Sequence, residues 1–201
     1  DMFSIPRGGF NPVYNSELEK QNYYIDMGLT ADNLAAELSI SREVQETFSI
    51  ASHEKALTAQ AEGRFQNEIV PVKLEDGTTI EADEGPRSPD LDKIHSLKPA
   101  FSEKGTVTAA TSSPFSIGAG AAILTSRQFA EQHSLNIRAE IVSRAVVGVE
   151  WERMGMGPIP AAEKALDIAG LTMDNIDIIE LNESFAAQAL YVMRKGGWTE
   201  E

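Results

Sequence analysis

The residues with the clearest potential for chemistry are Asn182 and Glu183, which follow directly on the apolar run Ile178 to Leu181. That run predicts a short buried strand, and the Ala-rich residues from Glu183 to Lys195 predict a helix after it. Active-site residues tend to project from the carboxyl ends of strands in an α/β layer. Asparagine is also a preferred helix N-cap, so Asn182 is alternatively the cap of this helix. The sequence leaves both roles open here.

The elements that must position these residues alternate between helices and strands. Helices are expected over residues 30–38, 41–63, 91–97, 126–133 and 158–170, and buried strands over 119–124, 137–149 and 178–181. The dipeptide Asp76-Gly77 predicts a hairpin between residues 69–74 and 78–80. Alternating strands and helices imply an α/β layered core, and the change to long apolar runs near Ser113 implies a domain boundary there.

Size and composition describe an ordinary globular chain. Its 201 residues, 42% hydrophobic and 24% charged, suffice for one large domain or two small ones. It contains no apolar run of about 18 residues, so no membrane span is expected. Residues 1–7 have neither the basic start nor the apolar core of a signal peptide, and a cytoplasmic location is expected.

The charge balance limits the partners. A formal net charge of −14 argues against nucleic acid, whose phosphates require clustered Lys and Arg. An anionic ligand would depend on a few local cations such as Arg87 or Lys93. His53 lies among the polar positions of the helix over 41–63, and we expect it to be a surface histidine.

The absence of some residue types is informative. The chain contains no cysteine, which excludes disulfides, thiolate metal sites and a cysteine nucleophile within it, and no metal site is expected. It contains neither a Gly-x-Ser-x-Gly elbow nor a Gly-x-Gly-x-x-Gly fingerprint, so an α/β hydrolase or a dinucleotide-dependent dehydrogenase finds no support.

A resemblance to a known family begins at Asn182 to Gln188, which is similar to the Asn-Glu-Ala-Phe-Ala motif of the thiolases, the coenzyme A-dependent acyltransferases. Further segments resemble that family in the same order: Met27 to Asn33, Gly63 to Phe65, Leu97 to Phe101, and Met154 to Ala161. The resemblance implies a partial thiolase-like layered α/β core with an inserted loop domain. Residues 1–112 would be the loop domain that contacts coenzyme A, and residues 113–201 the first part of the second core domain.

The same resemblance implies a reversible Claisen condensation. In thiolases one cysteine takes the acyl group from acyl-CoA, and a second cysteine removes a proton from the enolising partner. A histidine and a water held by the motif asparagine stabilise the thioester oxyanion. Asn182 matches that asparagine, and an uncharged amide suits the task because it donates to a water and accepts from a neighbour.

The resemblance also implies ligand contacts. Ser113 matches a serine beside the thioester and pantetheine arm, and Met154, Phe101 and Phe185 match apolar residues of that channel. Core packing is the alternative role for Phe101 and Met154. Arg87 falls near an arginine that lies by the adenine or the phosphates. The chain departs from the family at Pro114 and Ile117, which stand where glycine and aspartate are usual.

These observations together predict the middle portion of a thiolase. Its substrate would be a coenzyme A thioester, with no permanently bound cofactor. It would form a homodimer or homotetramer, with a hydratase/dehydrogenase as a possible partner subunit. This segment alone would be inactive because it lacks the cysteine nucleophile. The alternative is a non-catalytic, thiolase-derived module for acyl-CoA binding or protein interaction.

Overall fold

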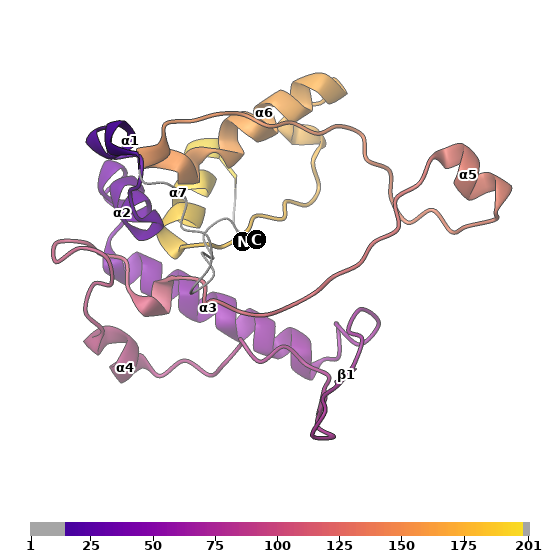
Figure 1. Ribbon diagram of the computed structural model, residues 1–201, viewed down its shortest axis with the longest axis horizontal. Helices are drawn as coiled ribbons and strands as arrows, with labels where there is room; N and C mark the ends of the chain where they lie inside the picture. Colours follow the sequence, from indigo (N-terminus) through magenta and orange to yellow (C-terminus); the bar gives the residue numbers. More distant parts are fainter. Residues whose placement is uncertain (1–14, 199–201) are drawn as a thin grey trace.

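The computed structural model describes residues 15–198, and residues 1–14 and 199–201 lie outside the described part. The elements in chain order are α1 (Ser16–Lys20), α2 (Met27–Glu37), α3 (Arg42–Ala61), β1 (Val72–Lys73), β2 (Thr79–Ile80), α4 (Leu91–Ser96), η1 (Ala109–Thr111), α5 (Arg127–Gln132), η2 (Trp151–Met156), α6 (Pro158–Ala169), η3 (Met173–Asn175) and α7 (Ala186–Gly196). Figure 1 shows α5 on a long irregular excursion away from the other helices.

The hydrophobic core lies where α2, α3, α7 and η2 meet. Leu34 of α2 and Tyr191 and Val192 of α7 are almost completely inaccessible to solvent. Val107, from the irregular segment before η1, is buried with them. The core therefore joins residues from all three thirds of the chain, and burial of their apolar surface is the main stabilising contribution.

A polar cluster of Glu37, Arg153 and Tyr191 links α2, η2 and α7 at the edge of this core. The Tyr191 hydroxyl donates to Glu37 Oε1 at 2.9 Å and accepts from Arg153 Nη2 at 3.0 Å. Arg153 also forms an ion pair with Glu37 Oε2 at 2.7 Å. The hydrogen bond from Tyr191 is the main reason that the pKa of the Glu37 carboxyl is lowered.

The helix predictions based on local capping chemistry are largely confirmed. Ser41 and Ser126 cap α3 and α5 by accepting hydrogen bonds from Val44 N and Phe129 N. The predicted α4 is present, and α6 begins at Pro158 and ends at Gly170, which adopts a left-handed conformation with φ 68°.

Two predicted helix starts are wrong. Asp26 caps α2 by accepting from Gly28 N, whereas the Thr30 hydroxyl bonds within the helix to Met27 O. The last helix begins at Ala186 with Phe185 as its N-cap and without a side-chain cap. Asn182 is therefore not a helix cap.

The hairpin around Asp76-Gly77 is confirmed as the antiparallel pair β1 and β2. The buried strands predicted over 119–124, 137–149 and 178–181 are wrong for this chain, because no described strand pairs with them. Ile123 and Ile178 are 93% and 78% exposed. A strand needs ladder partners, and the described residues supply none beside these segments.

The segment over 143–149 nevertheless keeps the alternation of a strand, with every second side chain partly buried. It lies along α6, where Ser143 Oγ donates to Ala165 O at 2.7 Å and Lys164 Nζ donates to Val146 O at 3.2 Å. Among the described residues, no helix is long and apolar enough to cross a membrane.

Candidate functional site

The residues that precede α7 are held against the segment that follows η1. The backbone N–H of Ser113 donates to Ser184 O at 2.9 Å, and Ser112 forms an isolated antiparallel bridge with Phe185. The pairing joins two segments far apart in the sequence. It brings Ser113 beside the segment 182–185, as expected if both face the same ligand.

Asn182 is exposed at the start of this segment, and its Nδ2 donates to Ser184 Oγ at 2.8 Å. An amide offers two donor hydrogens and a carbonyl acceptor. The bond to Ser184 uses one hydrogen and orients the group. The second hydrogen and Oδ1 bond to no described residue, so the amide can still hold a water.

At the end of this segment, the ring of Phe185 packs against a second aromatic ring, that of Phe101. Phe185 meets Phe101 edge to face, with ring centroids 5.9 Å apart and an interplanar angle of 83°. Phe101 lies against Gly28 of α2, where a Cβ atom would come within 2.1 Å of the ring. Both phenylalanines are half-buried, so they combine a packing role with an accessible edge.

A hollow of about 330 Å³ lies between α3, α4 and the segment around residue 87. Its lining consists of Ser49, Ile50, His53, Arg87, Ser88, Pro89, Asp90, Lys93, Ile94, Leu97, Ala109 and Ala110. Arg87 and Lys93 are its cationic residues, and both are exposed. Two cations with an apolar floor suit an anionic ligand that also has an apolar part.

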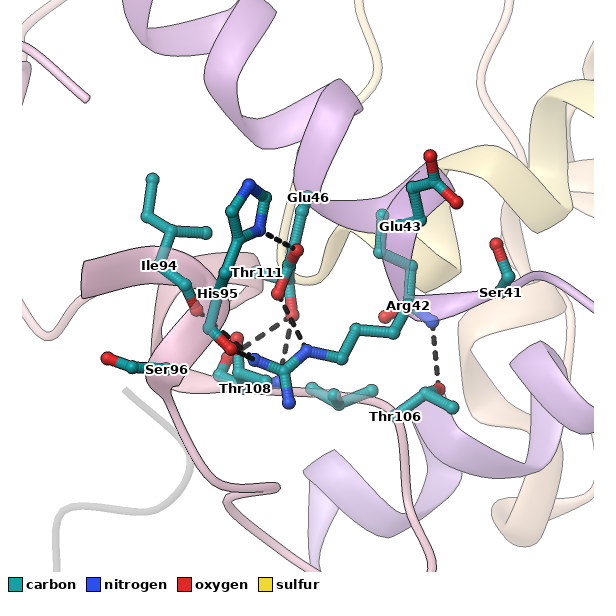
Figure 2. A network of polar contacts seen from close by, with 12 residues as sticks. Ser41, Arg42, Glu43, Glu46, Ile94, His95, Ser96, Thr106, Thr108 and Thr111 are labelled. Carbon is teal, nitrogen blue, oxygen red and sulfur yellow. Dashed lines mark hydrogen bonds and ion pairs between the residues drawn. The ribbon is translucent and has the colours of Figure 1, made fainter. Parts of the chain in front are cut away.

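A buried carboxylate fixes the α4 wall of this hollow. In Figure 2, Arg42 and His95 converge on Glu46. Arg42 Nε donates to Glu46 Oε1 at 2.6 Å, and His95 Nδ1 lies 2.8 Å from Glu46 Oε2. Arg42 Nη2 also donates to the carbonyl oxygens of Ile94 and His95.

Opposing effects act on the pKa of Glu46. Burial raises it most strongly, because the side chain is only 5% exposed. The hydrogen bonds from Arg42 and His95 and their charges together outweigh burial and lower the pKa. The carboxylate is therefore ionised in the folded protein and holds α4 against α3.

A second hollow, of about 150 Å³, lies next to the first one, and Glu183 of the segment 182–185 lines it. Ser113, Pro114 and Glu183 line it on one side, and Ser52 lies opposite them on α3. Glu183 Oε2 accepts from Ser52 Oγ at 2.7 Å, which ties the segment to α3. The two hollows share Ser49, His53 and Ala110.

The structure divides the residues predicted from the sequence. Asn182, Ser113, Phe185 and Phe101 lie together, and Arg87 lies in the larger hollow next to them. Met154 lies in a different element, η2, where it is half-buried. Of the predicted residues, Ser113 and Arg87 line a hollow, whereas Asn182, Phe101, Phe185 and Met154 line neither of the two. Both neighbours of Met154 contact α7: Arg153 Nη2 donates to the Tyr191 hydroxyl, and Gly155 O accepts from Gln188 Nε2 at 3.2 Å.

Two residues of the site, Ser52 and His53, were missed by the sequence analysis, whereas Glu183 had been singled out together with Asn182. His53 was expected on the surface, yet it is half-buried and lines both hollows. Ser49, Ser52 and His53 have the i, i+3, i+4 spacing of a single helix face, and this polar face was the available signal. Nowhere in the described part do three or more His, Asp or Glu side chains gather closely enough to hold a metal ion.

Comparisons with known proteins agree with this arrangement. Residues 11–128 match the thiolase N-terminal domain, and residues 135–201 match the thiolase C-terminal domain. The chain is 46% identical over 180 residues to an acetyl-CoA acetyltransferase of Shinella zoogloeoides, covering 88% of this chain and 46% of that protein. It is 42% identical over 191 residues to the peroxisomal 3-ketoacyl-CoA thiolase of Saccharomyces cerevisiae, covering 92% of this chain and 46% of that protein.

Solved structures give the same result. The dimeric peroxisomal thiolase of Saccharomyces cerevisiae matches with a TM-score of 0.84 at 38% identity, covering 95% of this chain and 51% of that one. Human mitochondrial 3-ketoacyl-CoA thiolase in complex with CoA matches with a TM-score of 0.85 at 33% identity, covering 96% and 51%. The chain thus spans about half the length of these relatives and has the corresponding part of their α/β fold. By both sequence and fold, it belongs to the thiolase family.

Proposed function

We propose that this chain is the central portion of a thiolase-type acyltransferase that acts on acyl-CoA thioesters. The reaction would be Claisen condensation or, in reverse, thiolytic cleavage of a 3-ketoacyl-CoA. The observation that carries the proposal is the pairing of 112–113 with 184–185, in which Ser113 bonds to Ser184, the same residue that orients the Asn182 amide. Two neighbouring hollows, which share Ser49, His53 and Ala110, lie between this pairing and the cations Arg87 and Lys93.

The hollows fit the two chemical parts of coenzyme A. Arg87 and Lys93 would meet the phosphates, because a chain of net charge −14 must bind an anion through local cations. Ser113 and the edges of Phe101 and Phe185 would face the arm that ends in the thioester. Coenzyme A would be a substrate, not a permanently bound cofactor.

Asn182 would act on the oxyanion through a water. Attack on a thioester carbonyl moves negative charge to its oxygen, and a preoriented donor stabilises that charge. The bond to Ser184 Oγ orients the amide while one Nδ2 hydrogen stays available. The cysteines that thiolase chemistry requires are absent from these 201 residues, so we expect the chain alone to be inactive.

A chimeric enzyme tests this role. Residues 15–198 would replace the matched segment of the Shinella zoogloeoides acetyltransferase, and cleavage of acetoacetyl-CoA would be measured. We expect an active chimera in which Asn182→Ala lowers kcat about 100-fold, the usual effect of losing one oxyanion donor. Asn67→Ala is the matched control, since Asn67 is an exposed asparagine in the turn after α3 and does not belong to the segment 182–185. Equal activity of the Asn182→Ala and Asn67→Ala chimeras would rule out the proposed role.

A second candidate function is an acyl-CoA-binding or interaction module without catalysis. The lack of cysteine, together with fully formed hollows, favours it. It predicts coenzyme A binding by this chain in calorimetry, together with a chimera that folds but does not turn over.

The proposal also covers assembly and location. A homo-oligomer is supported by the yeast relative, which is described as dimeric. A hydratase/dehydrogenase partner and a cytoplasmic location are further parts of the proposal. Co-purification of the partner from source cells and cell fractionation test these two parts.

A further inference from the structure

The helix α4 forms one wall of the larger hollow, but its own sequence does little to hold it in place. Each of its six residues is at least partly exposed. A helix this short is marginal in water, so contacts with neighbouring elements must stabilise it. Its cap, Asp90, is adjacent in the sequence and bonds to Lys93 N within the helix. The position of α4 therefore depends strongly on its contacts with α3.

Those contacts converge on one buried carboxylate. His95 Nδ1 lies 2.8 Å from Glu46 Oε2, and Arg42 Nε donates to Glu46 Oε1 at 2.6 Å (Figure 2). Arg42 Nη2 also donates to Ile94 O and His95 O, at the end of α4 where carbonyl groups lack partners within the helix. Loss of the negative charge of Glu46 would thus weaken two connections between α3 and α4.

The side of α4 that is attached differs from the side that faces the hollow. Lys93 lines the hollow, whereas His95, two positions later, contacts Glu46. Residues two apart in a helix do not share a face. Arg42, Glu46 and His95 are not among the residues that line the hollow. The attachment can therefore set the position of Lys93 without touching a ligand.

We propose that Glu46 and His95 are positioning residues that hold the ammonium group of Lys93 at the larger hollow, where it binds an anionic ligand. The proposal rests on the function proposed above, in which the phosphates of coenzyme A lie at this wall. A cation on an unattached segment loses conformational freedom when it binds, and that loss costs affinity. Attachment of α4 to α3 before the ligand arrives avoids part of this cost.

Amide hydrogen exchange over residues 91–96 tests the attachment without a ligand. We expect Glu46→Gln and His95→Ala to accelerate exchange there about three- to tenfold, the effect of losing roughly one hydrogen bond to a charged group at an exposed site. Glu43→Gln should leave it unchanged and is the matched control, because Glu43 is exposed in the first turn of the same helix. Circular dichroism checks that each variant is folded.

Calorimetry with coenzyme A tests the link to Lys93. We expect Lys93→Ala to weaken binding about three- to tenfold and Glu46→Gln to weaken it by no more than that, since Glu46 acts through Lys93. Removal of the negative charge of Glu46 would by itself favour an anion, so a loss of affinity in Glu46→Gln cannot come from direct electrostatics. The double variant should bind within about twofold of Lys93→Ala alone.

Three results would overturn the proposal: unchanged exchange over residues 91–96 in both α4-attachment variants, equal or tighter coenzyme A binding by Glu46→Gln, or additive effects of Glu46→Gln and Lys93→Ala. Additive effects would mean that Glu46 supports the fold in general and does not act through Lys93. Each of these results leaves the proposed function standing. Failure of the unmodified chain to bind coenzyme A would instead overturn the proposed function and, with it, this proposal.

Discussion

The absence of a side chain at Gly28 determines where Phe101 lies. A Cβ atom at this helical position would come within 2.1 Å of the Phe101 ring, and that ring packs against Phe185 beside Asn182. We expect Gly28→Ala to destabilise the protein by about 1–3 kcal/mol through overpacking. The destabilisation from overpacking outweighs the stabilisation from the higher helix propensity of alanine, which is at most about 1 kcal/mol. Urea denaturation monitored by circular dichroism measures the change.

Gly85→Ala is the matched control, because nothing lies within 4 Å of a Cβ atom at that position. A smaller side chain at position 101 should relieve the clash. The double variant Gly28→Ala with Phe101→Leu should therefore be more stable than the two single effects added together. Simple additivity would show that Gly28 and Phe101 do not interact as the structure indicates.

Individual residues differ in how far their roles could be read from the sequence. Asn182 could be found because it belongs to a recognisable motif. Whether it caps the helix could not be decided from the sequence, because that depends on the residue at which α7 begins. The position of His53 depends on contacts with Arg87, 34 residues away. Such a contact leaves no local pattern, so a surface position was the natural expectation.

The attachment of α4 to α3 depends on the ionised state of Glu46. The folded-state pKa of Glu46 is lowered from its usual value of 4.5, so its ion pairs contribute stability above that pH. The contribution is lost as pH falls through the lowered folded-state pKa. We expect Glu46→Gln to cost about 1–3 kcal/mol near neutral pH, since it removes a charge from two hydrogen bonds. Arg42 and His95 are 28% and 57% exposed, which favours the lower end of that range.

Urea denaturation at a series of pH values measures this difference between the unmodified protein and Glu46→Gln. The gap in free energy of unfolding should shrink as pH falls below about 4.5. Glu43→Gln is the control, because Glu43 is exposed on the same helix and its side chain has no partner among the described residues. A gap that stays constant down to acidic pH would contradict an ionised Glu46 in the folded state.

The helices and the local hairpin were predictable here, whereas the buried strands were not, for a physical reason. Ser41, Ser126 and Gly170 act through atoms a few residues away, so their sequence context contains the whole interaction. The runs 119–124 and 178–181 have strand composition, but a strand forms only with a neighbour to complete its ladder. The described residues supply such a neighbour only to β1 and β2. The predicted boundary between residues 112 and 113 stays a prediction.

The exposure of large apolar side chains differs strongly between parts of the molecule. The core of α2, α3, α7 and η2 is well buried, whereas the excursion that carries α5 exposes large apolar side chains. Phe115 and Ile117 are fully exposed, and Val146 is 86% exposed. Contiguous exposed apolar patches usually mark interaction surfaces or cause association. In this chain Phe115 and Ile117 lie on a segment that pairs with no described strand, so it can pair with a strand of another molecule.

We expect the chain to self-associate in a concentration-dependent way through these segments. Ile117→Lys should reduce the association, because it replaces a fully exposed apolar side chain with a charge. Ser116→Lys adds the same charge to the adjacent exposed position without removing apolar surface, so it is the matched control. Sedimentation velocity at two concentrations differing about tenfold measures the species present, since this range shifts a self-association by mass action. A monomer at both concentrations, or equal suppression by the two lysine variants, would show that apolar contact at Ile117 does not drive assembly.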